Sequence, residues 1–128
     1  MVQYEKDLLL KDLCARLPYG VMAKFGDSNP SKITNITQCI DSDSNSWFIE
    51  SEGESDGMCC PINNVKPYLF PLSSMTEEQN LEYLQTCMGG NSYVPTSASF
   101  DWCDKNHFDY RGLIPMGLAI DATGQNIY

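Results

Sequence analysis

Cys103 and His107 are the residue pair in this sequence best suited to do chemistry. They are four residues apart, and on a helix that spacing puts both side chains on one face, where they could bind one metal ion. Cys59–Cys60 or Cys87 would have to complete the site, but the two close ligand pairs that are typical of zinc sites are missing. Thiols packed in the core are the simpler interpretation, so we predict no metal site and no cofactor.

The same two residues could also belong to a cysteine hydrolase, which needs a thiol, a histidine and a group that orients the histidine. His107 is the one histidine of the chain, so any such site must use it together with Asp101, Asp104 or Asp109. Closeness along the chain does not establish the geometry of a triad. We therefore predict no catalytic residues, and a small metal- or thiol-dependent enzyme using Cys103 and His107 is the alternative.

The segment from 41 to 56 is rich in carboxylates and contains no basic residue. Its apolar centre, residues 47–49, is typical of a strand, so the segment fits a hairpin with acidic residues towards both ends. One interpretation is a hairpin whose charges serve only solvation. The other is an anionic surface that binds a basic partner. Its predicted contact residues are Asp41, Asp43, Trp47, Glu50, Glu52, Glu54 and Asp56.

A second candidate contact region, residues 101–114, is dense in aromatic and polar side chains. Trp, Tyr and Arg contribute most to binding energy in protein interfaces, so Trp102, Tyr110 and Arg111 are candidate partner-binding residues. The same side chains could instead anchor the C-terminal part of the chain on the core, with Arg111 paired to a nearby aspartate. Packing is the simpler interpretation, and a contact surface is the alternative.

The charge balance of the chain excludes several classes of partner. There are 17 Asp and Glu residues against 8 Lys and Arg, for a net charge of -9, which repels nucleic-acid phosphates and anionic membrane surfaces. We therefore expect no direct nucleic-acid binding and no membrane association. No basic segment followed by an apolar one begins the sequence, which predicts a cytoplasmic location and reduced cysteines.

The spacing of apolar residues predicts a helix over residues 4–17. Its apolar face is expected to include Cys14 as a small core residue. Its polar face is expected to carry Asp12 and Arg16 among other charged residues. Residues 18–20, Pro-Tyr-Gly, are expected to end it.

The middle of the chain predicts short strands over residues 21–26, 32–40, 47–49 and 58–65. Only polar turns separate them, and strands joined so closely favour antiparallel pairing because parallel pairing needs a longer crossover. Residues 66–72 contain two prolines. Because proline cannot donate a hydrogen bond to a neighbouring strand, we expect this segment to be an extended connection and not a central strand.

Two further helices are expected in the C-terminal part. One begins after an N-cap at Ser74 or Thr76 and runs to about Met88, and a shorter one covers residues 100–107. The sequence thus predicts a single α+β domain over residues 1–128. In it, an N-terminal helix precedes a small antiparallel sheet or a partly open SH3-like barrel, and the two C-terminal helices pack against it.

Three stretches of the sequence have a familiar order: residues 8–21, residues 65–76 and residues 107–114, together about a quarter of the chain. In this order they resemble short, uncharacterised proteins of phages, prophages and mobile elements in gut anaerobic bacteria. The resemblance implies a phage or mobile-element setting inside a host cell. It implies no known activity and assigns no role to any residue.

Size, acidity and the resemblance together predict a non-enzymatic, phage-associated accessory protein that binds another protein. The partner is expected to be a basic host or phage protein. The sharpest form of this hypothesis is an inhibitor of a bacterial defence nuclease, as anti-CRISPR proteins are. A virion or assembly component is a further alternative, which predicts self-association.

Overall fold

The protein is described by a computed structural model, which covers residues 2–27, 29–41, 44–52, 59–87 and 94–128. The helices are α1 (Gln3–Arg16), α2 (Glu77–Gln85) and α3 (Ser97–Lys105), with short 3-10 turns η1 (Leu17–Tyr19), η2 (Ile62–Asn64) and η3 (Leu72–Ser74). The strands are β1 (Met22–Phe25), β2 (Ser31–Asp41), β3 (Ser44–Ser51), β4 (Cys59–Pro61), β5 (Val65–Pro71), β6 (Phe108–Asp109) and β7 (Ile120–Asp121). The predicted α+β class is confirmed.

The strands form one mixed sheet in the order β4-β3-β2-β1-β5-β6, with β7 also paired to β5. The pairs β1–β2, β2–β3 and β3–β4 are antiparallel, as expected from their short connections, and the pair β1–β5 is antiparallel too. The pairs of β5 with β6 and β7 are parallel, so the sheet is mixed where a small antiparallel sheet was expected. These strands can be parallel because two helices intervene between β5 and β6. The SH3-like barrel stays a prediction.

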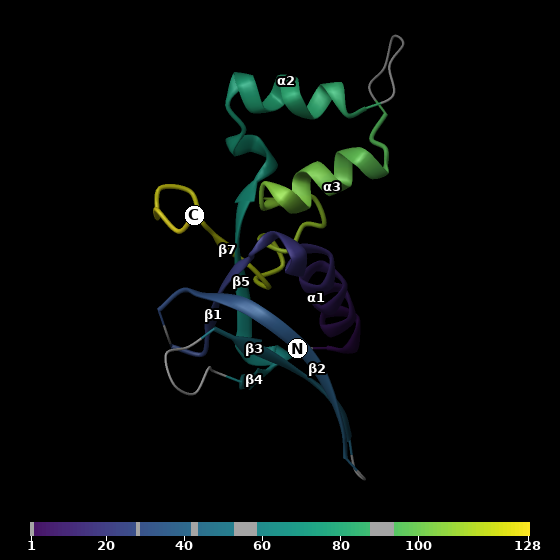
Figure 1. Ribbon diagram of the computed structural model, residues 1–128, viewed down its shortest axis with the longest axis vertical. Coiled ribbons are helices and arrows are strands. Elements are labelled where there is room, and N and C mark those ends of the chain that lie inside the picture. Colours follow the sequence, from purple (N-terminus) through teal and green to yellow (C-terminus); the bar gives the residue numbers. More distant parts are fainter. Residues whose placement is uncertain (1, 28, 42–43, 53–58, 88–93) are drawn as a thin grey trace.

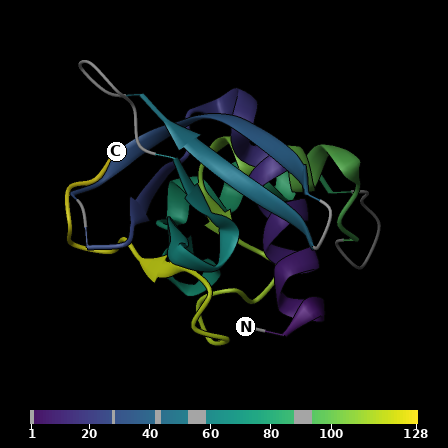
Figure 2. The ribbon, with the colours of Figure 1, turned by 90° about the horizontal axis from the view of Figure 1, so that it is seen from below.

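The helices gather towards one end of the molecule. Figure 1 shows α2 above α3 and α3 above α1, while the β2–β3 hairpin extends towards the opposite end. Seen from below, the long strands β2 and β3 are strongly curved, with α1 towards one side and the C-terminal residues towards the other (Figure 2). Among the described residues, no helix is long and apolar enough to cross a membrane.

The core lies where α1 meets the sheet and the C-terminal segment. Leu9 and Leu13 of α1 are fully buried there against apolar side chains of β1, β2, β3 and β5. The core residues are Leu9, Leu13, Val21, Ala23, Phe25, Ile33, Ile49, Ile62, Val65, Leu69, Leu113, Leu118 and Ala119. Burial of this apolar surface is the main favourable term that holds the helix on the sheet.

Strand β5 contradicts the prediction of an extended connection over residues 66–72. It lies inside the sheet and changes partners along its length. Pro67 is the last residue paired with β1, pairing with β7 begins at Tyr68, and Pro71 is the final residue of the strand. The prolines therefore occupy points where one pairing ends, and there a missing N–H costs least.

Helix α1 contradicts the expected division into one apolar and one polar face. Asp12 and Arg16, predicted to be on the polar face, are fully buried, whereas Cys14, predicted to be in the core, is exposed. The reason is that α3 and the segment after it cover a second side of α1. Arg16 reaches the backbone of that segment at Phe108. A helix covered on two sides buries residues that a single-face pattern assigns to solvent.

Candidate functional site

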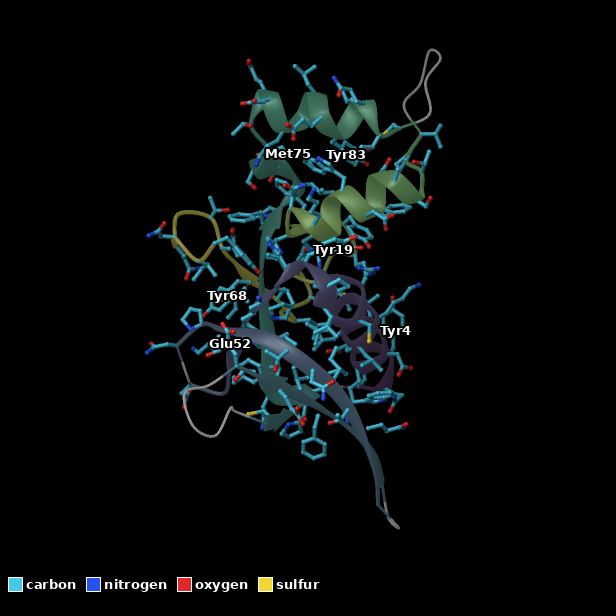
Figure 3. All side chains as sticks on the ribbon, viewed as in Figure 1. Tyr4, Tyr19, Glu52, Tyr68, Met75 and Tyr83 are labelled. Carbon is cyan, nitrogen blue, oxygen red and sulfur yellow. The ribbon has the colours of Figure 1, made fainter. Side chains whose placement is uncertain are left out.

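A groove of about 650 Å³ lies between α1 and α3. Two exposed aromatic side chains contribute to it, Tyr4 with 68% and Phe100 with 41% of its surface accessible. Tyr4 lies on the outer side of α1 (Figure 3). The groove is lined by Tyr4, Leu8, Lys11, Ala15, Ser97, Phe100, Asp101, Asp104, Tyr110 and Arg111. We call it the α1–α3 groove.

Next to the groove lies a buried ionic network that begins at Arg16. Its Nε atom donates to Asp12 Oδ2 at 2.9 Å, and both residues are fully buried. Its other two nitrogens donate to backbone carbonyls, Nη2 to Phe108 at 2.6 Å and Nη1 to Cys103 at 3.3 Å. Arg16 thus ties α1 to the end of α3 and to β6. A buried charge is tolerated when it is paired and hydrogen-bonded in this way.

Arg111 connects this network to the groove. Its Nη1 atom donates to Asp12 Oδ1 at 2.7 Å, so the Asp12 carboxylate bridges the two guanidinium groups. The side chain of Arg111 is 13% exposed, whereas that of Asp12 is completely covered. Arg111 therefore presents a fixed cation at the surface of the groove.

Asp104 is the second carboxylate of the network. Its Oδ1 atom lies 3.6 Å from Arg111 Nη1 and 3.9 Å from Arg16 Nη2, and it accepts no hydrogen bond from the described residues. Burial raises the pKa of this carboxyl, although a hydrogen bond from Tyr110 and the two arginines oppose the shift. With two arginines and two aspartates, the network as a whole carries no net charge.

Tyr110 also lines the groove. The Arg111 guanidinium lies over its ring at 4.4 Å from the centroid, and the Phe100 ring is 5.0 Å away. Burial is the main cause that raises the pKa of the Tyr110 hydroxyl, and its hydrogen bond to Asp104 adds to the shift. Tyr110 therefore stays protonated, and its contacts with Arg111 and Asp104 hold both residues in place.

Of the three candidate contact residues in the segment 101–114, the structure brings Tyr110 and Arg111 together in the groove. Trp102 is placed elsewhere. Its ring stacks on Phe108 with centroids 5.4 Å apart and lies 5.8 Å from the Tyr83 ring. Tyr83 lies between α2 and α3 (Figure 3). Trp102 thus packs α2, α3 and β6 together, which agrees with the packing interpretation for this residue.

The acidic residues of the segment 41–56 are only partly described. Asp41 ends β2, Glu50 lies in β3, and Glu52 is exposed just after that strand. Glu50 accepts a hydrogen bond from Asn35 at 3.3 Å. Asp43, Glu54 and Asp56 lie outside the described residues.

Trp47, the aromatic residue at the centre of this segment, is half-buried in β3 and packs against the core. It also lines a second hollow of about 370 Å³, together with Gln3 and Lys6 of α1 and Gln38 of β2. Trp47 is therefore not among the residues that line the α1–α3 groove.

Cys103 and His107 lack the features of a reactive pair. The thiol is buried, and burial raises its pKa to about 11 although Arg16 opposes the shift. The His107 ring stacks on Tyr128 at 3.8 Å, and burial with the charge of Arg16 lowers its pKa to about 4. At neutral pH the thiol is protonated and the imidazole is neutral, so the pair supplies no thiolate nucleophile. Within the described residues, no three His, Cys, Asp or Glu side chains gather as metal ligands.

Several residues of the site were not predicted as contact residues, namely Tyr4, Asp12, Arg16, Phe100 and Asp104. One signal was available: Asp12 and Arg16 are four residues apart, the spacing of an ion pair on a helix. Nothing in the sequence pattern showed that this pair would be buried or that Arg111 would join it.

Comparisons of the chain with protein-family models, with curated proteins and with solved structures found no match. The function is therefore inferred from the residues and the geometry of the chain itself.

Proposed function

We propose that this chain is a non-enzymatic accessory protein that binds another protein, and that the α1–α3 groove holds part of that partner. The observation that carries the proposal is the placement of two exposed aromatic rings, Tyr4 and Phe100, beside the fixed side chains of Tyr110 and Arg111. Aromatic residues and arginine contribute most of the binding energy in protein interfaces. Because Asp12 already holds Arg111, little side-chain entropy is lost when a partner binds.

The partner we propose is a basic protein. The charged side chains that line the groove balance one another, Lys11 and Arg111 against Asp101 and Asp104. The whole chain, however, carries a net charge of -9. The groove would therefore supply packing and hydrogen bonds, while the field of the whole molecule attracts a positively charged partner.

The setting we propose is a phage or mobile element acting in the cytoplasm of a bacterial host, as the resemblance implies. A nuclease that binds nucleic acid is a basic protein of the required kind, so an inhibitor of a bacterial defence nuclease is the sharpest form of the proposal. The enzyme alternative has less support, because Cys103 is a buried thiol with a raised pKa.

The test is a pull-down from a host lysate with the tagged chain and with two variants, followed by affinity measurements on the purified partner. Phe100→Ala removes an exposed ring of the groove, and we expect about tenfold weaker binding or more, as for an interface residue that contributes strongly. Leu81→Ala is the matched control, because Leu81 is an exposed apolar residue on α2, outside the groove, and its affinity should be unchanged.

The proposal requires one stoichiometric partner with an excess of Lys and Arg. Equal affinities for Phe100→Ala and for the wild-type chain would rule out the groove as the contact. A lysate that yields no partner would contradict the proposed function. Self-association of the purified chain, with loss on Phe100→Ala, would favour the virion or assembly component instead.

A further inference from the structure

We propose a second binding site, for the phosphate group of a small molecule, at Lys24 of β1 and Lys66 of β5. These two lysines are directly opposite each other in the antiparallel pairing of the strands, which lie side by side in Figure 1. Opposite residues of an antiparallel pair project from the same face, with Cβ atoms about 5 Å apart, and like charges in this position destabilise the pair. The fold thus places two lysine side chains opposite each other on one face of the sheet, and like charges in this arrangement cost stability.

Within the described residues, neither lysine forms an ion pair with a carboxylate that would offset the repulsion. The chain has 8 Lys and Arg against 17 Asp and Glu, so acidic partners are abundant. Yet every ion pair within the described residues uses Arg16 or Arg111. An anion from outside the protein would supply the missing partner for both lysines at once.

The two lysines border a hollow that can hold such an anion. It has a volume of about 390 Å³ and is also lined by Asn63, Asn64 and Asp27. The Asn63 and Asn64 side chains carry amide N–H groups, which can donate to the oxygens of an anion. The turn beside them is fixed, because Gly26 N donates to Asn64 O at 2.8 Å. Asp27 reduces the local charge but leaves an excess of one positive charge.

The residue types indicate a phosphate group. The lysine ammonium is a compact point charge that binds phosphate, and two such groups together can balance the two negative charges of a phosphate dianion. Long phosphate polymers are disfavoured, because the net charge of -9 repels nucleic acids. The ligand class is therefore a small phosphate compound, either free inorganic phosphate or a phosphomonoester. This site is separate from the α1–α3 groove and does not depend on the proposed function.

Calorimetric titration of the purified chain with inorganic phosphate, and separately with glycerol phosphate, tests the site. Ionic strength is held constant with sodium chloride. We expect saturable binding that Lys24→Gln and Lys66→Gln each weaken about tenfold or more, because each removes a charged hydrogen-bond donor. Lys105→Gln, at an exposed lysine on α3, is the matched control and should bind like the wild-type chain.

Binding of both compounds supports recognition of the phosphate group itself, and binding of only one identifies its source. If neither compound binds, or if Lys24→Gln and Lys66→Gln bind as tightly as Lys105→Gln, the proposal is overturned. Thermal unfolding separates loss of the site from loss of the fold. Without phosphate, Lys66→Gln should unfold no earlier than the wild-type chain, because a repulsion is removed. With phosphate, the wild-type midpoint should rise, and that of Lys66→Gln should rise less.

Discussion

Arg16 shows at the scale of one residue how the interior of this protein uses charge. It is fully buried, and it binds Asp12 and the carbonyls of Cys103 and Phe108. We predict that Arg16→Met lowers the free energy of unfolding by about 3–5 kcal/mol, because Asp12 stays buried after losing one of its two cations. Urea unfolding measures the change. Lys11→Met, on the same helix at an exposed position, is the control, and equal losses in both variants would contradict a structural role of the network.

The buried His107 should make the free energy of unfolding depend on pH. Burial and the charge of Arg16 lower its pKa to about 4 in the folded state, against about 6.5 in the unfolded chain. Between these values the unfolded chain binds more protons, so this residue contributes stability at neutral pH that is lost as the pH falls from about 6.5 towards 4. Unfolding curves across this range should show the loss.

His107→Asn separates this effect from the titration of the carboxylates. Asparagine has no titratable group and accepts the positive φ of 64° found at this position. Burial raises the pKa of Asp104. This carboxyl titrates in both proteins, so its contribution cancels when the stability of the variant is subtracted from that of the wild-type chain. The wild-type chain should therefore lose more stability on acidification than His107→Asn. Parallel pH profiles would contradict a buried, neutral His107.

The sequence predicted the residues of the site unevenly. Interface propensity selected Tyr110 and Arg111, which the structure places in the groove. Helical periodicity put Cys14 in the core and left Arg16 outside it, whereas Cys14 is exposed and Arg16 is fully buried. Periodicity assumes one buried face, and α1 is covered on two sides. Whether a charge is buried depends on a partner distant in sequence, such as Phe108, which no local pattern specifies.

At the scale of elements, local signals predicted most of the fold. Turn residues separated β1, β2 and β3, and the first helix was predicted within a residue of its observed bounds, Gln3–Arg16. The strand predicted over residues 58–65 is shorter, because β4 ends at Pro61 and the 3-10 turn η2 follows it. The strands were predicted wrongly where contacts between distant parts of the chain determine the pairing. Strand β5 carries prolines at points where its partners change, and β6 and β7 have two residues each, too few for a periodic pattern.

The start of α2 offers a test of a local signal. Thr76 was one of two predicted N-caps, and it forms a capping box in which Gln79 N donates to its hydroxyl at 3.1 Å and Thr76 N donates back to Gln79 Oε1 at 2.9 Å. We predict that Thr76→Ala lowers the free energy of unfolding by about 1 kcal/mol, because a backbone N–H loses its acceptor. Ser73→Ala, exposed and just before the helix, should change it little. Equal effects in urea unfolding would show that the capping box adds nothing.

At the scale of the whole molecule, the negative net charge does not come from the proposed contact surface. The lining of the α1–α3 groove is close to neutral, with Lys11 and Arg111 against Asp101 and Asp104, whereas the chain carries a net charge of -9. Long-range attraction mainly sets how fast partners meet, and close packing mainly sets how long they stay together. The proposed complex should therefore respond differently to salt and to changes in the groove.

We predict that raising the salt concentration slows association of the purified partner but changes its dissociation little. The field of the acidic chain is screened over about 8 Å at physiological ionic strength, and over less at higher salt. Phe100→Ala should do the opposite, with faster dissociation and a nearly unchanged association rate, because it removes packing and no charge. Stopped-flow or surface-binding kinetics measure both rates. If the association rate does not depend on salt, long-range electrostatic attraction does not guide the partner to this chain. If Phe100→Ala leaves the dissociation rate unchanged, the contact lies outside the groove.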